Sequence, residues 1–308
     1  MSSNLPDVQN RPDHRGIALD RVGLTNVKFP TRILRKNDGV CEVSAKVKLF
    51  ANLPQEAKGH NLSRFSEVLI EFGETHKVLS SHSMPLLLTR MQERLGSTDV
   101  YARFEFDYYI DKEAPVSKKI APQAYNCAFT GIKKGEDINF ILEVNVTAAS
   151  VCPCSKEMSL SENYLKDKYS GSEGFHSGPM LRFNNPQSSD LECLIEFKQM
   201  GMGAHNQRSQ IKVEALLNDI LWIEDLVPLI EAQASAPTYP ILKRPDEKSV
   251  TETGYTNPKF SEDIARDVQI VVDSLKEVKA WSIKIENEES IHPFNVLSSS
   301  KSDNWNFH

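Results

Sequence analysis

Residues 138–146 read Ile-Asn-Phe-Ile-Leu-Glu-Val-Asn-Val, and residues 152–157 follow shortly after as Cys-Pro-Cys-Ser-Lys-Glu. The first run alternates apolar and polar side chains, which is typical of a β-strand with one buried face. Pro153 fixes its own φ and favours an extended Cys152, so we expect the strand to give way to a stiff loop that carries two thiols. Such thiols can ligate a metal, act as a nucleophile or perform redox chemistry, and two inert structural thiols are an equally open interpretation.

Two further alternating runs lie in the N-terminal half, at residues 43–51 and 100–110. Alternation of this kind predicts half-buried antiparallel strands. Between them, residues 61–73 and 77–95 carry apolar side chains at helical spacing, so we expect two helices there. The order of strand, helix pair and strand pair is typical of an α+β fold.

A second round of similar order occupies the C-terminal half. We expect a short strand at 211–215, an apolar helix around 218–232 and a closing strand at 281–285. Before that last strand, Asn257 and Pro258 are residue types that cap and begin a helix. The sequence therefore predicts two units of similar construction.

These patterns divide the chain into five parts. Clusters of Ser, Gly and Asn between the two units are typical of an insertion, and the Ser-rich C-terminal end is expected to be loose. The expected parts are an N-terminal arm (1–16), a first unit (17–150), a segment with the metal motifs and an insertion at about 158–200 (151–208), a second unit (209–294) and a polar tail (295–308).

The composition bounds the class of protein. The 308 residues are 40% hydrophobic and 25% charged, which is typical of a globular protein with a sizeable core. A formal net charge of -6 argues against nonspecific nucleic-acid binding, so an anionic ligand needs a local cluster of Lys and Arg. Five sparse cysteines argue against a disulfide scaffold and favour a reducing cytoplasm. A polar start and the lack of a long apolar run predict neither a signal peptide nor a membrane span.

Two polar motifs further along the chain contain residue types that bind metals and anions. His205 is followed by Asn, Gln and Arg208 just before an apolar strand, which fits a ligand-facing edge or a solvated loop. Lys243 and Arg244 can bind phosphates, and Glu247 can join a thiolate and an imidazole around a tetrahedral zinc. A charged turn is the alternative interpretation of this second motif.

Three other places carry reactive or ligand-binding side chains. Glu262 falls in the first turn of an expected helix, where the helix dipole favours a carboxylate that can accept two N–H groups from a guanine edge. His292, after the last strand, has the side chain of a general acid or base. His60, Ser63 and Arg64 stand at a helix start that can hold an anion. Each place also has a plainer interpretation, as surface, turn or capping residues.

Taken in order, these motifs resemble those of GTP cyclohydrolase I, type IB. The resemblance extends over nearly the whole chain, and several motifs in one order are more specific than any one of them. The matching motifs lie at 7–9, 15–17, 59–65, 152–157, 204–209, 243–248 and 289–292.

The resemblance implies the tunnelling fold (T-fold), with two tandem units of antiparallel sheet and paired helices on one face. It also implies homotetramers with active sites at subunit interfaces, and therefore a triphosphate cluster assembled across an interface. One divalent metal per site is implied, zinc first and manganese or iron as alternatives, with Cys152, His205 and Glu247 as its ligands. The residues implied in the catalytic pocket are Cys152, Cys154 and His292. The residues implied in substrate binding are Glu262, His60, Ser63, Arg64, Arg208, Lys243, Arg244 and Glu289.

The implied reaction is hydrolytic opening of the imidazole ring of GTP, release of formate and reclosure to 7,8-dihydroneopterin triphosphate, the first step of tetrahydrofolate-type pterin biosynthesis. The sequence departs from most relatives at residues 158–200, which separate the Cys and His motifs and which we interpret as a surface excursion. Two alternatives stay open. One is a T-fold nitrile reductase with a Cys nucleophile, and the other is a non-catalytic purine- or metal-binding protein.

Overall fold

The computed structural model describes residues 9, 11–37, 39–76, 78–160 and 203–307. In this part of the chain, nine strands form one antiparallel sheet: β1 (Leu19–Arg35), β2 (Gly39–Leu53), β3 (Asp99–Glu113), β4 (Ile120–Lys134), β5 (Asp137–Val151), β6 (Asn206–Leu217), β7 (Ala236–Pro237), β8 (Val278–Glu288) and β9 (Asn295–Lys301). Their order is β1-β2-β3-β4-β5-β6-β8-β9, and β7 pairs with β5 beyond the point where the pairing of β5 with β4 ends.

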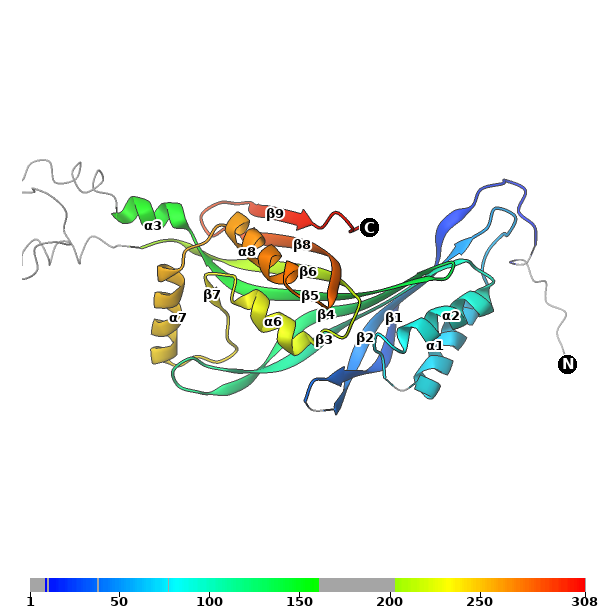
Figure 1. Ribbon diagram of the computed structural model, residues 1–308, viewed down its shortest axis with the longest axis horizontal. Helices are drawn as coiled ribbons and strands as arrows, with labels where there is room; N and C mark the ends of the chain where they lie inside the picture. The colour runs from blue at the N-terminus through cyan, green and yellow to red at the C-terminus, as the bar shows by residue number, and fades with distance from the viewer. Residues whose placement is uncertain (1–8, 10, 38, 77, 161–202, 308) are drawn as a thin grey trace, which may run out of the picture.

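Helices pack on one face of this sheet. The described helices are α1 (Ser63–His76), α2 (Met84–Leu95), α3 (Pro153–Leu160), α6 (Ile223–Glu231), α7 (Arg244–Thr256) and α8 (Ser261–Asp273). The α1–α2 pair covers the strands nearest β1, whereas α6 and α8 cover β5, β8 and β9. The molecule is elongated, with α1 and α2 towards one end and α3 and α7 at the other (Figure 1). No helix in the described ranges is long and apolar enough to cross a membrane.

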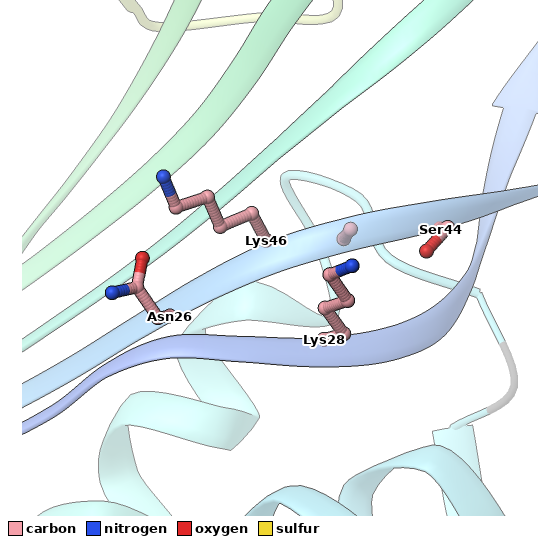
Figure 2. A pocket seen from close by; sticks show the side chains of 5 residues that line it. Asn26, Lys28, Ser44 and Lys46 are labelled. Atoms are coloured by element: carbon pink, nitrogen blue, oxygen red, sulfur yellow. The ribbon is translucent and has the colours of Figure 1, made fainter.

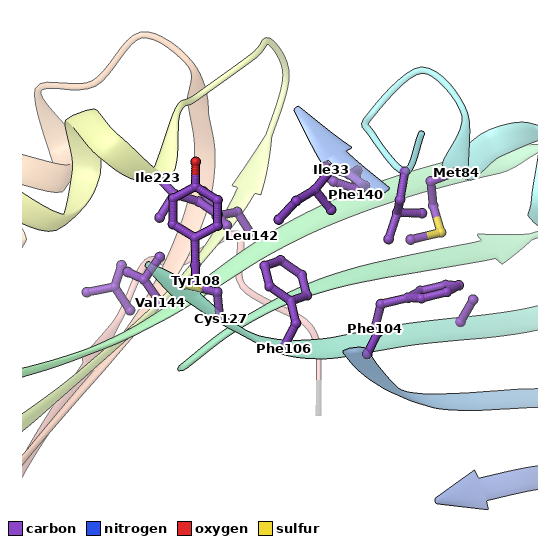
Figure 3. Close-up of a cluster of buried hydrophobic side chains, with 14 of the residues drawn as sticks. Ile33, Met84, Phe104, Phe106, Tyr108, Cys127, Phe140, Leu142, Val144 and Ile223 are labelled. Atoms are coloured by element: carbon purple, nitrogen blue, oxygen red, sulfur yellow. The ribbon is translucent and has the colours of Figure 1, made fainter. Parts of the chain in front are cut away.

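The main core lies between the helices and the sheet. Alternate residues of β3 point into it, and Phe104, Phe106 and Tyr108 are each at most 2% exposed. Leu142 of β5 and Met84 of α2 belong to the same cluster (Figure 3). Full burial of side chains of this size contributes about 1.5–3 kcal/mol each, so this layer holds the helices on the sheet.

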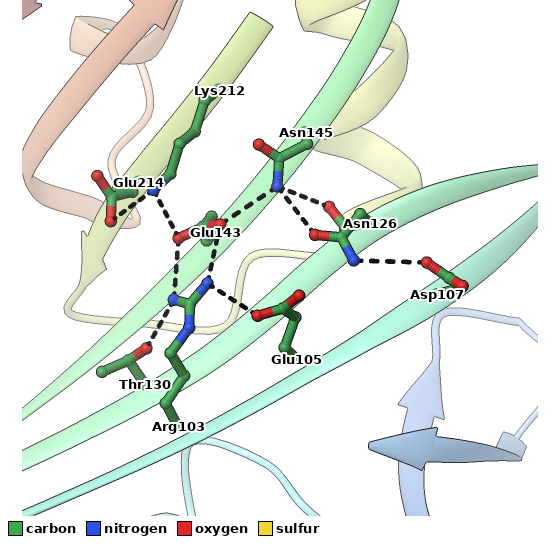
Figure 4. A network of polar contacts seen from close by, with 9 residues as sticks. All are labelled: Arg103, Glu105, Asp107, Asn126, Thr130, Glu143, Asn145, Lys212 and Glu214. Atoms are coloured by element: carbon green, nitrogen blue, oxygen red, sulfur yellow. Dashed lines mark hydrogen bonds and ion pairs between the residues drawn. The ribbon is translucent and has the colours of Figure 1, made fainter. Parts of the chain in front are cut away.

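The opposite face of the sheet carries a polar network (Figure 4). Arg103 of β3 donates two hydrogen bonds to the Glu143 carboxylate of β5, at 2.9 and 3.0 Å, and Lys212 Nζ lies 3.0 Å from the same carboxylate. Burial alone raises the pKa of Glu143, but the hydrogen bonds and charges of Arg103 and Lys212 outweigh it and lower that pKa to about 2. For Glu214, burial and the charge of Glu143 raise the pKa against the opposing charge of Lys212. The network therefore ties β3, β5 and β6 together across β4.

The expected α+β class, with an antiparallel sheet and helices on one face, is confirmed. The five strands expected from alternation lie within β2, β3, β5, β6 and β8, and the helices expected at 61–73 and 218–232 correspond to α1 and the shorter α6. Strands β1, β4 and β9 and helix α7 were not expected. The division into two tandem units stays a prediction, since one sheet runs through both. Of the expected insertion at about 158–200, residues 161–200 lie outside the described residues.

The helix expected at 77–95 begins at Met84 instead. The preceding residues form a turn around the Ser83 hydroxyl, which accepts a hydrogen bond from the Ser80 N–H at 2.9 Å and donates one to the Val78 carbonyl at 2.8 Å. Serine hydroxyls compete in this way with the helical backbone pattern, so the apolar spacing alone placed the helix start too early.

The helix expected to begin at Asn257 begins instead at Ser261. Asn257 ends α7, because its N–H donates to the Thr253 carbonyl at 3.1 Å. Pro258 then lacks the N–H that a continuing helix needs. Glu262 nevertheless keeps its expected place in the first turn of α8.

The expectation of a loose polar tail at 295–308 is wrong for the residues that the structure describes there. Residues of β9 pair with β8 throughout, and the Ser298 hydroxyl lies 2.7 Å from the Ser261 hydroxyl of α8. Trp305 is 4% exposed and packs against Ile141 and its neighbours on the face opposite the helices. Serine-rich composition misled the prediction, because these serines bond to a helix and one Trp anchors the end of the chain.

Candidate functional site

Cys152 lies where β5 ends, but a helix follows it rather than the expected loop. Pro153 occupies the first position of α3, where its missing N–H breaks no helical hydrogen bond. The Cys152 carbonyl accepts from the Lys156 N–H and the Ser155 hydroxyl, both at 3.3 Å. Cys152 is half-buried and Cys154 is exposed. The first thiol is therefore held at a rigid strand-to-helix junction.

His205 stands beside Cys152 at the start of the neighbouring strand. The pairing of β5 with β6 places Val151 opposite Asn206, and the Cys152 N–H donates to the His205 carbonyl at 3.0 Å. The His205 N–H donates in turn to the Ser155 hydroxyl at 3.2 Å. Two residues from separate motifs are thus joined directly by the backbone.

A third strand adds side chains to the same end of the sheet. Gln207 of β6 donates from Nε2 to the Glu289 carboxylate at 2.9 Å, just after β8 ends. Its Oε1 lies 3.0 Å from His205 Nδ1, and the Ser290 hydroxyl lies 3.4 Å from the same nitrogen. Arg208 is exposed on β6 opposite Glu288.

Glu262 belongs to the same end of the sheet through the start of α8. The Lys259 N–H donates to the Val151 carbonyl at 3.0 Å, and the Ser150 hydroxyl donates to the Lys259 carbonyl at 2.8 Å. These bonds fix the segment before α8 next to the residue that precedes Cys152. Glu262 follows three residues later, exposed, and accepts from the Ser261 hydroxyl at 3.0 Å.

The remaining residues of the last motif are exposed. His292 lies in the segment between β8 and β9 and stacks on Phe294, with 5.0 Å between ring centroids and 9° between ring planes. Among the described residues, its ring contact is with Phe294, and no contact with Cys152 or His205 is found.

The motif of Lys243, Arg244 and Glu247 forms the N-terminus of α7, with all three side chains exposed. The far end of this helix approaches the Cys152 junction, because Lys156 Nζ donates to the Tyr255 carbonyl at 2.7 Å. Eight residues of helix, about 12 Å, separate that carbonyl from Glu247. Within one chain, Glu247 therefore lies at the other end of α7 from the Cys152–His205 pair rather than joining it.

Asp246 explains why α7 takes this direction. It is fully buried, and its carboxylate accepts the backbone N–H groups of Val116, Ser117 and Lys243 at 2.7–2.8 Å. Burial alone raises the pKa of Asp246, but the hydrogen bonds from Ser117, Lys243 and Val116 hold it well below its usual range. The carboxylate thus anchors the start of α7 to the turn between β3 and β4.

Asp246→Asn is expected to lower the free energy of unfolding at neutral pH. Because the folded pKa is depressed, the stability that this carboxylate contributes is fully present above the unfolded value of about 3.9 and is lost as pH falls towards the folded pKa. Urea unfolding at neutral and acidic pH should show the variant starting lower and losing less on acidification. Glu252→Gln, at an exposed carboxylate of α7, is the matched control and should follow the wild type at both pH values. Identical curves for Asp246→Asn and wild type would contradict the anchoring role.

The third group of expected residues lies at the start of α1, towards the opposite end of the molecule from α3 (Figure 1). His60 is 8% exposed, and its Nε2 donates to the Asn52 carbonyl at 2.9 Å. The Ser63 hydroxyl donates to Asn61 Oδ1 at 2.8 Å, and Arg64 is half-buried. One chain therefore brings Cys152, His205 and Glu262 to one end and leaves His60, Ser63 and Arg64 near the other.

Among the residues that the structure describes, no three His, Cys, Asp or Glu side chains lie close enough together to hold a metal ion. Cys152 and His205 offer a thiolate and an imidazole from hydrogen-bonded neighbours, which are donors that zinc and related ions accept. These two residues fit a metal centre in their chemistry, whereas the same chain's Glu247 does not lie beside them.

A shallow depression of about 330 Å³ lies on β1 and β2, lined by Asn26, Lys28, Ser44, Ala45 and Lys46 (Figure 2). Lys28 and Lys46 are paired opposite each other in the register of the two strands. The depression contains none of the expected site residues.

Sequence reasoning missed Gln207 beside His205 and Asp246 at the start of α7. Gln207 belongs to the same motif as His205, and its spacing of two residues along a strand puts both side chains on one face, which was the available signal. Asp246 stands at the third position of a helix after Lys243, which is the position where an acidic side chain caps the helix backbone. Neither was predicted, because the neighbouring His205 and Glu247 are the residue types that ligate metals.

A family model described as type I GTP cyclohydrolase FolE2 matches residues 5–298, which contain all the motifs described above. The chain belongs to the type I GTP cyclohydrolase FolE2 family. The expectation from the motifs is thus confirmed at the level of type I, and this description makes no further subdivision.

Similar FolE2 proteins match along nearly their whole length. The GTP cyclohydrolase FolE2 of Azoarcus sp. is 37% identical over 94% of this chain and 91% of that protein. Those of Magnetococcus marinus and Geobacter metallireducens are 35% and 34% identical, over 94% and 98% of this chain and 92% and 98% of theirs. Among solved structures, uricase from Arthrobacter globiformis is similar with a TM-score of 0.48 and 8% identity, over 92% of both chains.

Proposed function

We propose that this chain is a GTP cyclohydrolase of type IB, which opens the imidazole ring of GTP by hydrolysis, releases formate and recloses the product to 7,8-dihydroneopterin triphosphate. The observation that carries the proposal is membership of the FolE2 family over residues 5–298. Relatives in Magnetococcus marinus and Azoarcus sp. bear the cyclohydrolase name, which favours this function over nitrile reduction or simple ligand binding. The proposal includes the first step of tetrahydrofolate-type pterin biosynthesis, in the cytoplasm.

In this proposal, Cys152, His205 and Glu247 hold one divalent metal, zinc first and manganese or iron as alternatives. Such an ion, when bound, supplies Lewis acidity and makes hydrolysis by water feasible at neutral pH. The direct backbone bond between Cys152 and His205 supports the first two ligands. The position of Glu247 at the distant end of α7 supports a third ligand from a second copy of the chain.

The chain's other residues bind the substrate and move protons. Glu262 accepts the N1–H and the 2-amino group of guanine, and its helix N-terminus supports this negative charge. His292 and Cys154 deliver or remove protons at the ring nitrogens. Both side chains are exposed, and they follow the ends of β8 and β5 in the sequence. The Glu289 carboxylate has one oxygen bonded to Gln207 and presents the other to the substrate. The triphosphate is bound by the basic and polar side chains His60, Ser63, Arg64, Arg208, Lys243 and Arg244.

The separation of these groups supports an active site shared between subunits of a homotetramer. The α1 group (His60, Ser63 and Arg64) lies far from the Cys152 group (Cys152, His205 and Glu262) in one chain, because α1 and α3 are towards opposite ends of the molecule (Figure 1). An interface in a closed oligomer can place one part of a chain against a different part of its neighbour, so the α1 group of one copy can complete the Cys152 end of the next.

Turnover of GTP tests the activity directly. The purified protein, supplied with zinc or manganese, should convert GTP to a product that becomes fluorescent as a pterin after oxidation, with one formate released per GTP. ATP should give neither signal. If the protein forms neither pterin nor formate with zinc, manganese or iron, the proposed function is refuted.

Mixed oligomers test the shared site. Cys152→Ala and Arg64→Ala should each be nearly inactive alone, because one removes a ligand and the other a phosphate contact. Co-expressed, they should regain about a quarter of wild-type activity, since random neighbours leave that share of shared sites intact. Cys152→Ala mixed with His205→Ala is the control: both residues come from one end of one chain, so this mixture should stay inactive. Recovery in the control mixture, or none in the test mixture, would contradict the shared site.

A further inference from the structure

Gln207 connects His205 to Glu289 at the end of β6. Its Nε2 donates to the Glu289 carboxylate at 2.9 Å, and its Oε1 lies 3.0 Å from His205 Nδ1. All three side chains are half-buried, so their hydrogen bonds are partly shielded from water. The three residues come from β6, from the residue just before it and from the end of β8, which pair in the sheet.

The chemistry of these groups fixes the direction of the chain of hydrogen bonds. A carboxylate only accepts hydrogen bonds, so the Gln207 amide must turn its NH₂ towards Glu289. The amide oxygen is then left facing His205, and an oxygen can only accept. His205 must therefore carry its proton on Nδ1, and in the neutral imidazole Nε2 is left with a lone pair.

We propose that Glu289 and Gln207 act as positioning residues that hold His205 in the Nδ1–H tautomer, so that Nε2 faces the proposed metal as its ligand atom. The inference rests on the proposed function in taking His205 as a ligand. A metal-bound His commonly donates its other ring N–H to an oxygen, and here the acceptor is an amide whose orientation a second residue controls. Glu289 thus acts on the imidazole through Gln207, in addition to any contact with the substrate, and this series of hydrogen bonds from Glu289 through Gln207 to His205 is called the relay below.

Ser290 is the other described group that faces this nitrogen. Its hydroxyl lies 3.4 Å from Nδ1, farther than the amide oxygen. As an acceptor, it shares the same N–H and supports the same tautomer. As a donor, it would compete with Gln207, and the shorter contact to the amide oxygen favours the Nδ1–H form.

The chain offers a matched control on the same two strands. Gln210 Nε2 donates to the Glu288 carboxylate at 3.0 Å, so a second Gln–Glu pair bridges β6 and β8. Instead of a histidine, the amide oxygen of Gln210 accepts from the Thr147 hydroxyl at 2.8 Å. Substitutions in this pair report what the loss of a Gln–Glu bridge does to the sheet alone.

The first test reads the tautomer in metal-free protein, by nitrogen-15 NMR of the His205 ring recorded over a series of rising pH values until the spectrum no longer changes. Wild type should show a protonated Nδ1 and an unprotonated Nε2. Glu289→Gln removes the group that orients the amide, and Gln207→Leu removes the acceptor, so both should shift the ring towards Nε2–H. Gln210→Leu should keep the wild-type spectrum. An Nε2–H ring in wild type, or an unchanged ring in both variants, would overturn the proposal.

The second test measures zinc affinity by competition with a chelator. Gln207→Leu and Glu289→Gln should bind zinc about 10- to 100-fold more weakly, as expected for lost outer-shell support. The double substitution Gln207→Glu with Glu289→Gln reverses donor and acceptor between the two positions at constant net charge, and it still places an oxygen at Nδ1. It should recover most of the affinity and the Nδ1–H spectrum. Wild-type affinity in Gln207→Leu, or no recovery in the double variant, would count against the relay.

These results separate the relay from the function on which it rests. If His205→Ala binds zinc as tightly as wild type, His205 is not a ligand and the proposed metal centre fails, whatever the tautomer. If His205→Ala loses zinc but the ring of wild type carries its proton on Nε2, the metal centre stands and the relay fails.

Discussion

Cys152→Ala is expected to lose the bound metal and to reduce GTP turnover to below about 1% of the wild-type rate. Loss of an outer-shell partner of a metal ligand typically costs 10- to 100-fold, and loss of the ligand itself costs more. The chain should remain folded, because Cys152 is half-buried at a strand-to-helix junction and its described hydrogen bonds use only its backbone. Alanine keeps those backbone bonds.

Metal analysis of purified Cys152→Ala, together with circular dichroism, makes this measurement. Cys154→Ala should keep more of the metal, since the Cys154 side chain is exposed beyond the junction. Cys41→Ala controls for the loss of a thiol and should keep both metal and turnover. Cys41 lies in β2, which is separated from β5 and Cys152 by β3 and β4 in the sheet. Full occupancy in Cys152→Ala would remove this residue from the ligand set, and an empty site in Cys154→Ala alone would exchange the roles of the two cysteines.

Strands with regular alternation could be predicted from the sequence, because one residue's neighbours two positions away already reveal the buried face. Strand β1 was not predicted because its register shifts twice, between Leu19 and Val22 and between Leu24 and Val27. Asn26, at the second shift, has a φ of 60°. Each shift moves the following side chains to the other face and breaks the pattern.

Strand β4 escaped notice for a different reason. Residues on both of its faces are buried, such as Tyr125 and Cys127 towards the helices and Ala128 and Ile132 on the other side. The second face is covered by the polar network around Arg103 and by Trp305, which come from distant parts of the chain. Local alternation cannot report burial that a distant segment provides.

The members of the candidate site could be named from motif order, but their placement could not. The neighbourhood of Cys152 and His205 depends on the register of β5 against β6, which joins segments on either side of a long intervening stretch. The direction of α7, and with it the position of Glu247, depends on the buried anchor at Asp246. Neither follows from local spacing, because both result from contacts between residues far apart in the chain.

Glu262→Gln is expected to keep the metal and the fold and to lose about 10⁴-fold in GTP turnover. Guanine presents two N–H donors on its N1 and N2 edge, and a carboxylate can accept both. The amide of Gln offers a donor in place of one acceptor, so one N–H of the bound base is left without a partner. Sites that bind a substrate by paired polar groups reject unpaired combinations by about 10⁴ or more.

The helix position of Glu262 requires a control, since removing a negative charge from the first turn also weakens the helix by about 0.3–1 kcal/mol. Asp263→Asn removes the adjacent charge, whose carboxylate accepts the Phe260 N–H at 3.0 Å and so caps α8. This control should lower the melting temperature while GTP stays strongly preferred over ATP. Turnover and binding of both nucleotides should be measured for wild type, Glu262→Gln and Asp263→Asn. Recognition of the base by Glu262 requires that the first substitution abolish GTP binding and that the second preserve it, and equal losses in the two variants would reduce Glu262 to a helix-stabilising carboxylate.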